Sequence, residues 1–334
     1  MSVIPFHHAM AAHCESGSVA ALLNHAGLTI SEPMVFGISA GIFFAYLKIP
    51  SMHFPVFAVR SKPGDIRRNS AKRLGATFKT VTFRDPVKAK KTLEELLEKS
   101  IPVAVQVDMF YMEYIPAHLR THFNAHFIVV FGKENGLFHV SDCYYPTTAT
   151  LTEAALESGR FAKGDFAPRG LMFYPSDVPK EPNIEQAVLK GIRQAARNML
   201  KLPIPFIGIR GIRMFSKKVV SWPDYARNSD QLSHEIMKIH ILLEEQGTGG
   251  GGFRFMYATF LQEASKLLNK PVLSDLSRNM MANGDKWREI SVFAARIGKN
   301  RDFGENRLQE LSAMITQRAD EEEKLFTDLL HFTK

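Results

Sequence analysis

The first half of the chain alternates helical and strand-like patterns of apolar residues. Residues 16–27 place apolar side chains at helical spacing and end at Gly27, a residue type that commonly terminates helices. Later apolar runs are short, which predicts strands, with a helix among them at 87–100. The predicted strands lie at 54–61, 78–85, 102–108 and 170–175, with a strand pair at 125–144. One helix followed mostly by antiparallel strands indicates an α+β fold.

The strand pair at 125–144 has the pattern of a hairpin. Two β-rich runs are joined by GKENG, in which Asn135 and Gly136 are suited to a tight turn. The start of the first strand therefore lies beside the end of the second.

The pattern changes after residues 174–183, a polar stretch rich in proline that is typical of a linker. The segments beyond it repeat apolar residues at helical spacing. They lie at 184–201, 229–247, 254–270, 272–298 and 306–332. We therefore predict an α+β domain at 1–177 and a helical domain at 178–334.

Composition adds limits to this picture. The chain has 334 residues, of which 45% are apolar, enough for two buried cores. No apolar run reaches the roughly 18 residues of a transmembrane helix, and the N-terminus lacks the pattern of a secretion signal. We therefore expect a cytoplasmic protein with no integral membrane segment. In that compartment the two cysteines, Cys14 and Cys143, are expected to be free thiols.

The formal charge of +8 favours an acidic partner, which could be nucleic acid, anionic lipid or an acidic protein. The basic residues are scattered, for example at 66–73, 88–91 and 209–218. No nucleic-acid-binding motif accompanies them, so we expect no nucleic-acid partner.

Cys14 lies at the front edge of the first predicted helix, where the helix dipole favours a thiolate. A nucleophilic thiolate needs a base, and the base needs a group that orients it. The hairpin offers both, because His126 opens its first strand and Asp142 follows its second. The sequence thus predicts a Cys14, His126, Asp142 triad. Without Cys14 and Asp142, His126 would be interpreted as an ordinary strand histidine. The second cysteine, Cys143, is interpreted as a buried structural thiol.

These residues resemble papain-like cysteine enzymes. More closely, HCESGSVAALLNHAG, PVAVQVDMFYMEY, HFNAHFIVVFG and VSD resemble the N-terminal domain of the BtrH-type acyltransferase family of butirosin biosynthesis, and GTGGGGFRFMYATFLQEAS with DKWREI resembles the helical domain fused to it. The resemblance implies a papain-like catalytic domain and a helical domain that completes or covers the substrate site. It also implies transfer of an acyl group from an acidic acyl carrier protein to a small-molecule amine. Cys14 would be the nucleophile, His126 the base and Asp142 its orienter, with no cofactor, because phosphopantetheine enters as part of the substrate.

The chain departs from the papain-like pattern before the cysteine. Papain-like enzymes usually have a glutamine there that donates to the oxyanion, whereas this chain has PFHHAMAAHC. The backbone N–H of Cys14 can supply one donor. His8 and His13 are the candidates for a second, and His13 is included among the substrate-binding residues.

Other candidate substrate-binding residues follow the strand at 102–108. Asp108, Tyr111 and Tyr114 either line a pocket rim or serve as turn and packing residues. His122 lies four residues before His126, but Phe123 stands where a zinc motif needs glutamate, so His122 is interpreted as a pocket residue and no metal is expected. Residues 31–46 lack the lysine of a phosphate loop, and their small residues are expected to let a helix pack under the active site.

The glycine run at 247–252 precedes Arg254 and a predicted helix. This arrangement predicts an anion site for the phosphopantetheine phosphate, or alternatively a flexible loop between helices.

Two alternative functions are considered: hydrolysis and a non-catalytic scaffold. The triad could instead hydrolyse its acyl-enzyme, as a thioesterase or peptidase does, if water rather than an amine attacks. A non-catalytic scaffold would need a missing triad member, and none is missing. The acyl group, the acceptor and the oligomeric state do not follow from the sequence.

Overall fold

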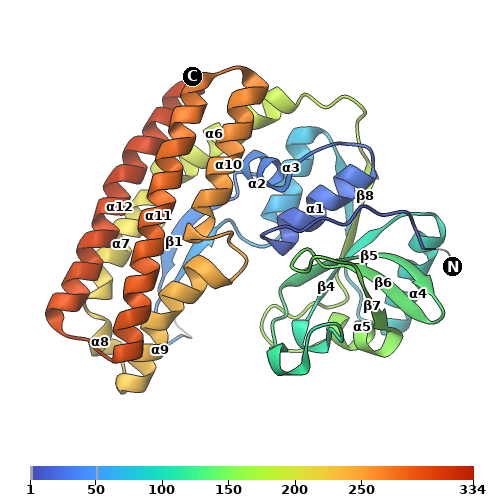
Figure 1. Ribbon diagram of the computed structural model, residues 1–334, viewed down its shortest axis with the longest axis horizontal. Helices are drawn as coiled ribbons and strands as arrows, with labels where there is room; N and C mark the ends of the chain where they lie inside the picture. The colour runs from blue at the N-terminus through green and yellow to red at the C-terminus, as the bar shows by residue number, and fades with distance from the viewer. Residues whose placement is uncertain (1–2, 50–51) are drawn as a thin grey trace. The chain divides into compact units, whose positions relative to one another are not determined.

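A computed structural model describes residues 3–49 and 52–334 of the chain (Figure 1). The chain folds into two compact units. The first comprises the residues up to Val35 together with Leu74–Pro182, and the second comprises Phe36–Arg73 together with Asn183–Lys334. The first unit contains an antiparallel sheet with helices, and the second is mostly helical, which confirms the predicted fold class.

The observed division corrects the predicted domains at 1–177 and 178–334. The boundary after Pro182 lies close to the predicted boundary after residue 177. However, residues 36–73, which were predicted to lie in the first domain, belong to the helical unit. They form the antiparallel strands β1 (Ile42–Leu47) and β2 (Val56–Arg60). A two-stranded sheet alone has marginal stability, so it must pack against other apolar side chains. Phe44 of β1 packs against Phe215 and Trp287 of the same unit.

The first unit is built on a six-stranded antiparallel sheet in the order β3-β8-β4-β5-β6-β7. Its strands are β3 (Thr77–Val81), β4 (Val103–Val107), β5 (His126–Glu134), β6 (Leu137–Ser141), β7 (Ala149–Thr152) and β8 (Met172–Asp177). All the predicted strands are present. The four-residue strand β7 was not predicted, because it is too short to show an alternating pattern.

The helices of this unit are α1 (Cys14–His25), α4 (Pro86–Glu98), α5 (Glu153–Arg160) and the single turns η1 (Met109–Tyr111) and η2 (Ala117–Leu119). Helices α2 (Glu32–Ile38) and α3 (Asp65–Leu74) each contain residues of both units. Helix α1 packs on β4, β5 and β8, so the sheet positions the helix that begins with Cys14.

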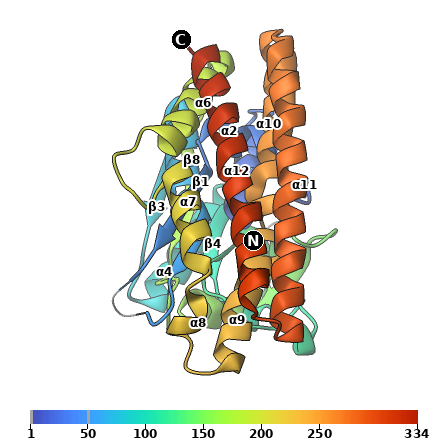
Figure 2. The ribbon, with the colours of Figure 1, turned by 90° about the vertical axis from the view of Figure 1, so that its left-hand side faces the viewer.

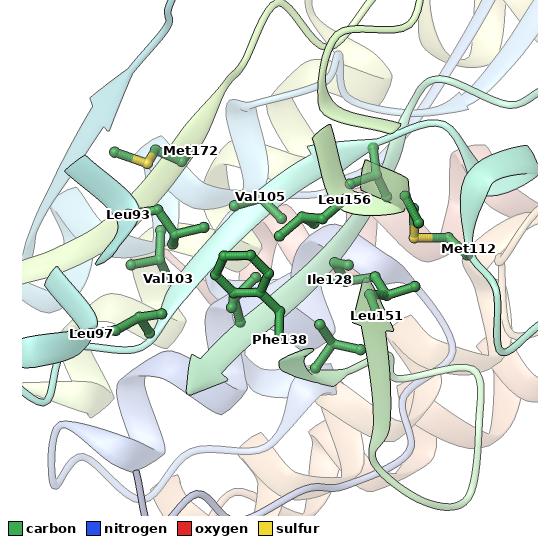
Figure 3. Close-up of a cluster of buried hydrophobic side chains, with 14 of the residues drawn as sticks. Leu93, Leu97, Val103, Val105, Met112, Ile128, Phe138, Leu151, Leu156 and Met172 are labelled. Carbon is green, nitrogen blue, oxygen red and sulfur yellow. The ribbon is translucent and has the colours of Figure 1, made fainter. Parts of the chain in front are cut away.

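The core of the first unit lies between the sheet and helices α4 and α5 (Figure 3). Leu93 and Leu156 from the two helices meet Val105, Ile128 and Phe138 from three neighbouring strands. All five side chains are buried. Burying apolar side chains of this size stabilises a fold by about 1.5–3 kcal/mol each, so this cluster holds β4 and β5 rigidly.

The hairpin β5–β6 turns where the sequence predicts. Asn135 and Gly136 have φ angles of +50° and +80°, the left-handed conformations that a two-residue hairpin turn requires. A bulge between Val130 and Gly132 shifts the strand register by one residue.

The second unit contains the paired strands β1 and β2 and a set of long helices. The helices are α6 (Ile184–Leu200), α7 (Gly208–Val219), α8 (Trp222–Tyr225), α9 (Ser229–His240), the π-helical turn η3 (Ile241–Glu245), η4 (Gly251–Phe253), α10 (Arg254–Leu268), α11 (Pro271–Asn300) and α12 (Glu305–Phe332). Figures 1 and 2 show α11 and α12 side by side. Helix α7 was not predicted, because basic residues separate the apolar positions Ile209, Ile212 and Phe215 that it buries.

The expectation for residues 31–46 was wrong in part. The helix ends at Ile38, and the aromatic, β-branched run that follows forms β1, as such residues favour strands. The small residues do allow close packing, but within the helical unit: a Cβ on Gly37 would overlap the ring of Phe260, at 2.0 Å.

No helix among the described residues is long and apolar enough to cross a membrane. Within residues 3–49 and 52–334, no cluster of three or more His, Cys, Asp or Glu side chains is arranged to hold a metal ion.

Candidate active site

Cys14 is the first residue of helix α1, as its position in the sequence predicts. The preceding residue, His13, caps the helix, and its ring accepts a hydrogen bond from the Ser16 N–H at 3.3 Å. The thiol therefore lies in the first turn, where the helix dipole favours negative charge. His13 is 4% exposed and its ring caps the helix, while its predicted role in substrate binding stays a prediction.

Glu32 fixes the chain that leads into this helix. Its carboxylate accepts hydrogen bonds from the backbone N–H groups of Ala12 and His13 and from the Ser16 hydroxyl, each at 2.8 Å. Burial raises the pKa of this carboxyl, although the three hydrogen bonds oppose the shift. Sequence analysis missed Glu32, because nothing in its local pattern indicates which backbone it contacts.

The structure brings His126 and Asp142 together. Asp142 directly follows β6, and the pairing of Val129 with Ser141 places Asp142 diagonally opposite His126 on the hairpin. The His126 Nε2–H donates to Asp142 Oδ2 at 2.8 Å. The two side chains are 0% and 1% exposed.

Asp142 is held by more than the histidine. The Tyr114 hydroxyl donates to Oδ2 at 2.7 Å, and the Tyr144 N–H donates to Oδ1 at 3.1 Å. Burial opposes ionisation of Asp142, but the charge of His126 and these hydrogen bonds lower its pKa. Tyr114 was considered only as a pocket-rim or packing residue, and its contact with the triad becomes visible only in the fold.

The second ring nitrogen of His126 is left for the cysteine. Within the part of the chain that the structure describes, the buried Nδ1 has no hydrogen-bond partner. Burial would lower the pKa of His126, but the charge of Asp142 and interactions with Asp142 and Cys14 raise it to about 10. This environment favours the imidazolium form of His126, the kind of partner that activates a cysteine nucleophile. When protonated, the thiol points at the Ala125 carbonyl oxygen, at 3.7 Å.

Cys143 is the neighbour of Asp142 but has a different environment. It is buried, and burial followed by the charges of Cys14, Asp142 and Glu32 raises its pKa well above the usual range for a thiol. It packs against Gly17 of α1, where an added Cβ would lie 3.3 Å from the Cys143 side chain. These features agree with the structural role expected for it.

The histidine considered as an oxyanion donor, His8, is engaged elsewhere. Its Nδ1 is 2.8 Å from the Ser141 hydroxyl, and its Nε2 donates to the Tyr145 carbonyl at 2.9 Å. The ring therefore ties the N-terminal segment to the end of β6. Tyr144 instead lies beside the triad, with its ring 5.1 Å from that of His126. Sequence analysis did not identify Tyr144.

Asp108, Tyr111 and His122 gather at the end of β4. The Asp108 carboxylate caps η1 by accepting from Phe110 N–H at 3.0 Å, and it also contacts the His122 ring at 2.7 Å. Tyr111 lies edge-on to His122, with the ring centroids 6.1 Å apart.

Arg254 does not have the role expected from the sequence. It is fully buried in the second unit, where Nε and Nη2 bind the two carboxylate oxygens of Glu322 at 2.9 and 3.0 Å. Its guanidinium also lies 4.8 Å from the centre of the Trp287 ring. A cation compensated in this way is not available to a phosphate, so the predicted anion site at Arg254 is wrong.

The glycine run is occupied by contacts of its own chain. The Gly251 N–H donates to a Glu244 carboxylate oxygen at 2.9 Å, and the Gly250 N–H donates to the Thr248 hydroxyl at 3.0 Å. Both glycines have positive φ. The run is therefore an ordered turn between helices, closer to the alternative interpretation.

The N-terminal part of the chain is similar to a known protein family. Residues 13–143 match the family described as butirosin biosynthesis protein H, N-terminal, and this range contains Cys14, His126 and Asp142. No functionally curated protein matches the chain. A solved structure described as a C39-like peptidase from Bacillus anthracis has 12% sequence identity and a TM-score of 0.37, covering 54% of this chain and 100% of that one.

The second match covers more than half of the chain. Residues 154–329 match a domain of unknown function, DUF4872. The matched ranges follow the sequence rather than the compact units, since residues 36–73 fall inside the first match and belong to the second unit. The chain therefore belongs to the DUF4872 family, with an N-terminal region of the butirosin biosynthesis protein H type.

Proposed function

We propose that this protein is a cysteine acyltransferase that moves an acyl group from an acyl carrier protein thioester to an amine. The observation that carries the proposal is the buried His126, which binds Asp142 through Nε2 and leaves Nδ1 for Cys14 at the start of α1. This arrangement has the parts that covalent acyl transfer needs: a nucleophile, its base and an orienting carboxylate.

In the first half of the reaction, the Cys14 thiolate attacks the thioester carbon and a new C–S bond forms. Negative charge develops on the carbonyl oxygen, to which the Cys14 N–H at the helix start can donate. The bond to the pantetheine sulfur then breaks, and the His126 imidazolium gives its proton to that sulfur, which leaves as a thiol.

In the second half, an amine attacks the acyl carbon of acyl-Cys14. The proton released by the attacking nitrogen goes to His126, and the C–S bond breaks to give the amide. Cys14 leaves as a thiolate, which restores the ion pair with His126.

Burial of the triad supports transfer over hydrolysis. Cys14, His126 and Asp142 are 4%, 0% and 1% exposed. A site that excludes water protects an acyl-enzyme until the acceptor arrives. The alternative, a thioesterase or peptidase, would need water to reach the acyl carbon.

The charge of the second unit supports an acidic donor protein. Two adjoining hollows of about 670 and 660 Å³ share Arg193, Gln194, Arg197 and Asn198 of α6. Lys72, Arg73, Lys190 and Lys201 add further positive charge, and no Asp or Glu side chain of the described residues lines either hollow. Such a surface attracts an acidic protein and raises the rate at which the two proteins associate.

Intact-protein mass spectrometry tests the proposal. The protein is mixed with acyl carrier proteins that bear different acyl groups, without an amine. We expect the wild type and the matched control Cys143→Ala to gain the mass of the acyl group, and Cys14→Ala to gain nothing. An adduct on Cys14→Ala contradicts the assignment of the nucleophile. No adduct with any thioester, together with cleavage of a peptide library, favours the hydrolase.

A further inference from the structure

A second histidine–aspartate pair lies in the first unit, separate from the triad. His122 Nδ1–H donates to Asp108 Oδ2 at 2.7 Å, and Asp108 Oδ1 accepts from the N–H groups of Phe110 and Phe123 at 3.0 and 2.9 Å. The Asp108 side chain is 2% exposed, so its orientation is fixed by the fold. A buried carboxylate bound to one ring nitrogen orients an imidazole for proton transfer at the other.

The other nitrogen of this ring faces outward. The His122 side chain is 64% exposed, and among the described residues no hydrogen bond engages Nε2. The ring stacks on Phe110, with centroids 4.1 Å apart and planes 18° apart, and meets the edge of Tyr111. An exposed side chain usually keeps its rotamer freedom, whereas this one is held by a charged hydrogen bond and two aromatic rings. The result is a preoriented acid–base group open to a ligand.

This pair and the triad lie at the same end of the neighbouring strands β4 and β5. Val107 pairs with His126 at the end of β4, and beyond the strands the Met109 N–H donates to the Phe123 carbonyl at 3.2 Å, one residue out of that register. Asp108 directly follows Val107, and Ala125, whose carbonyl oxygen accepts from the Cys14 thiol, directly precedes His126. The two histidine–aspartate pairs therefore lie at the same end of neighbouring strands, which lie about 5 Å apart.

An amine acceptor reacts faster where a base in addition to His126 is present. Near neutral pH an alkylamine is an ammonium ion, which has no lone pair for attack. It must lose one proton before it attacks the acyl carbon and a second one afterwards. The second proton goes to His126 when the ion pair with Cys14 is restored, so a second base that takes the first proton raises the fraction of bound acceptor that can attack. Water needs no such step, because it attacks as a neutral molecule and gives its proton to His126.

We infer that Asp108 and His122 form a second acid–base dyad, in which His122 Nε2 takes the first proton from the acceptor ammonium. The N–H bond of the ammonium breaks, Nε2 gains the proton, and the neutral amine attacks acyl-Cys14. His122 later releases its proton to solvent, and the Asp108 carboxylate stabilises the transient imidazolium. The inference rests on the proposed acyl transfer and identifies the acceptor as a protonated amine.

Single-turnover kinetics of a preformed acyl-enzyme test the dyad. The variant is His122→Gln and the matched control is His118→Gln, which changes another exposed histidine nearby. The acyl-enzyme is mixed with butylamine, which is protonated at neutral pH, or with hydroxylamine, which is neutral. Loss of acyl mass and formation of the amide are followed together.

For His122→Gln we expect acylation of Cys14 and hydrolysis of the acyl-enzyme within about twofold of wild type, and transfer to butylamine about 100-fold slower. Transfer to hydroxylamine should stay near the wild-type rate, as should both transfers in His118→Gln. Equal losses with the two amines, or no loss with butylamine, overturn the dyad while the acyltransferase stands. A wild-type acyl-enzyme that reacts with neither amine, or no acyl-enzyme at all, overturns the proposed function and the dyad with it.

Discussion

His126 and Asp142 are joined by a hydrogen bond of 2.8 Å from Nε2 to Oδ2, and almost no part of either side chain is exposed. The carboxylate stabilises a positive charge on the ring that burial would otherwise exclude. It also fixes which ring nitrogen is left for Cys14. Asp142 thus sets both the charge and the orientation of the base.

Replacing Asp142 with asparagine should therefore impair catalysis much more than folding. Asp142→Asn keeps the shape but removes the negative charge, which lowers the His126 pKa and weakens the thiolate–imidazolium pair. We expect acylation of Cys14 to slow about 100- to 10,000-fold, as for other triads. Tyr114→Phe, which removes one donor to Asp142, should slow it only about tenfold. Stopped-flow acylation measures both, with the exposed Asp328→Asn as the control.

The raised pKa of His126 also predicts how stability depends on pH. The folded pKa of about 10 lies above the ordinary value of 6.5, so its contribution is complete below about pH 6.5 and is lost as the pH rises to about 10. The free energy of unfolding of the first unit should fall by a few kcal/mol over this window.

Amide hydrogen exchange in β5, corrected for intrinsic rates, can measure this fall. Tryptophan fluorescence cannot, because Trp222 and Trp287 both belong to the second unit. In Asp142→Asn the dependence on pH should be much weaker. Parallel curves for the two proteins would show that the His126–Asp142 pair is not its source.

Gly17 allows α1 to pack where the thiol needs it. A Cβ at this position would lie 2.6 Å from the Ala11 Cβ and 3.3 Å from the Cys143 side chain. Gly17→Ala should therefore displace the first turn of α1 and slow acylation at least tenfold, since small displacements of a nucleophile are costly. Ala11→Gly removes the closest atom, so the double variant should recover most of the rate. No recovery would mean that the contact with Ala11 does not set the position of the helix.

The sequence predicted the elements that hold the triad because their signals are local. A glycine ends α1, Asn135 and Gly136 close the hairpin, and these features fix where Cys14, His126 and Asp142 lie along their own elements. Contacts between distant segments had no such signal. Glu32 reaches the helix start and Tyr144 reaches the His126 ring only once the chain has folded.

The errors have the same origin. Arg254 follows glycines, which suggested an anion site, but its partner Glu322 lies 68 residues away in another helix. Residues 36–73 interrupt the first unit without a change in composition that marks the boundary. In both cases the prediction relied on neighbours in the sequence. Arg254 was assigned to the adjacent glycine run, and residues 36–73 were assigned to the domain that surrounds them in the sequence.

Glu322 should be essential for the stability of the second unit. Besides Arg254, its carboxylate accepts from Asn283 Nδ2 at 2.7 Å and Trp287 Nε1 at 2.6 Å, and it is fully buried. Glu322→Ala leaves the Arg254 cation without compensation, which costs about 3–5 kcal/mol. Urea unfolding followed by tryptophan fluorescence measures the loss, with the surface variant Glu323→Ala as the control. An Arg254→Met, Glu322→Met double variant should recover part of the loss, because it removes the uncompensated cation but leaves the Asn283 and Trp287 donors without their acceptor. It should leave the KM for the acyl carrier protein unchanged.

The basic surface of α6 should govern the affinity for the acyl carrier protein. Lys190, Arg193, Arg197 and Lys201 recur every three or four residues, so they form one stripe about 16 Å long on the helix. We expect Arg197→Glu with Lys201→Glu to raise the KM for the carrier at least tenfold at low salt and leave kcat unchanged, because the charges act on encounter.

Added salt should raise the wild-type KM and have little effect on the double variant, since screening weakens the same attraction. A small pantetheine thioester, which lacks the acidic protein, should react equally with both enzymes. Arg210→Glu, an exposed charge reversal on α7 outside the two hollows, is the control. If it raises the KM for the carrier as much as the double variant does, net charge rather than the α6 stripe attracts the carrier.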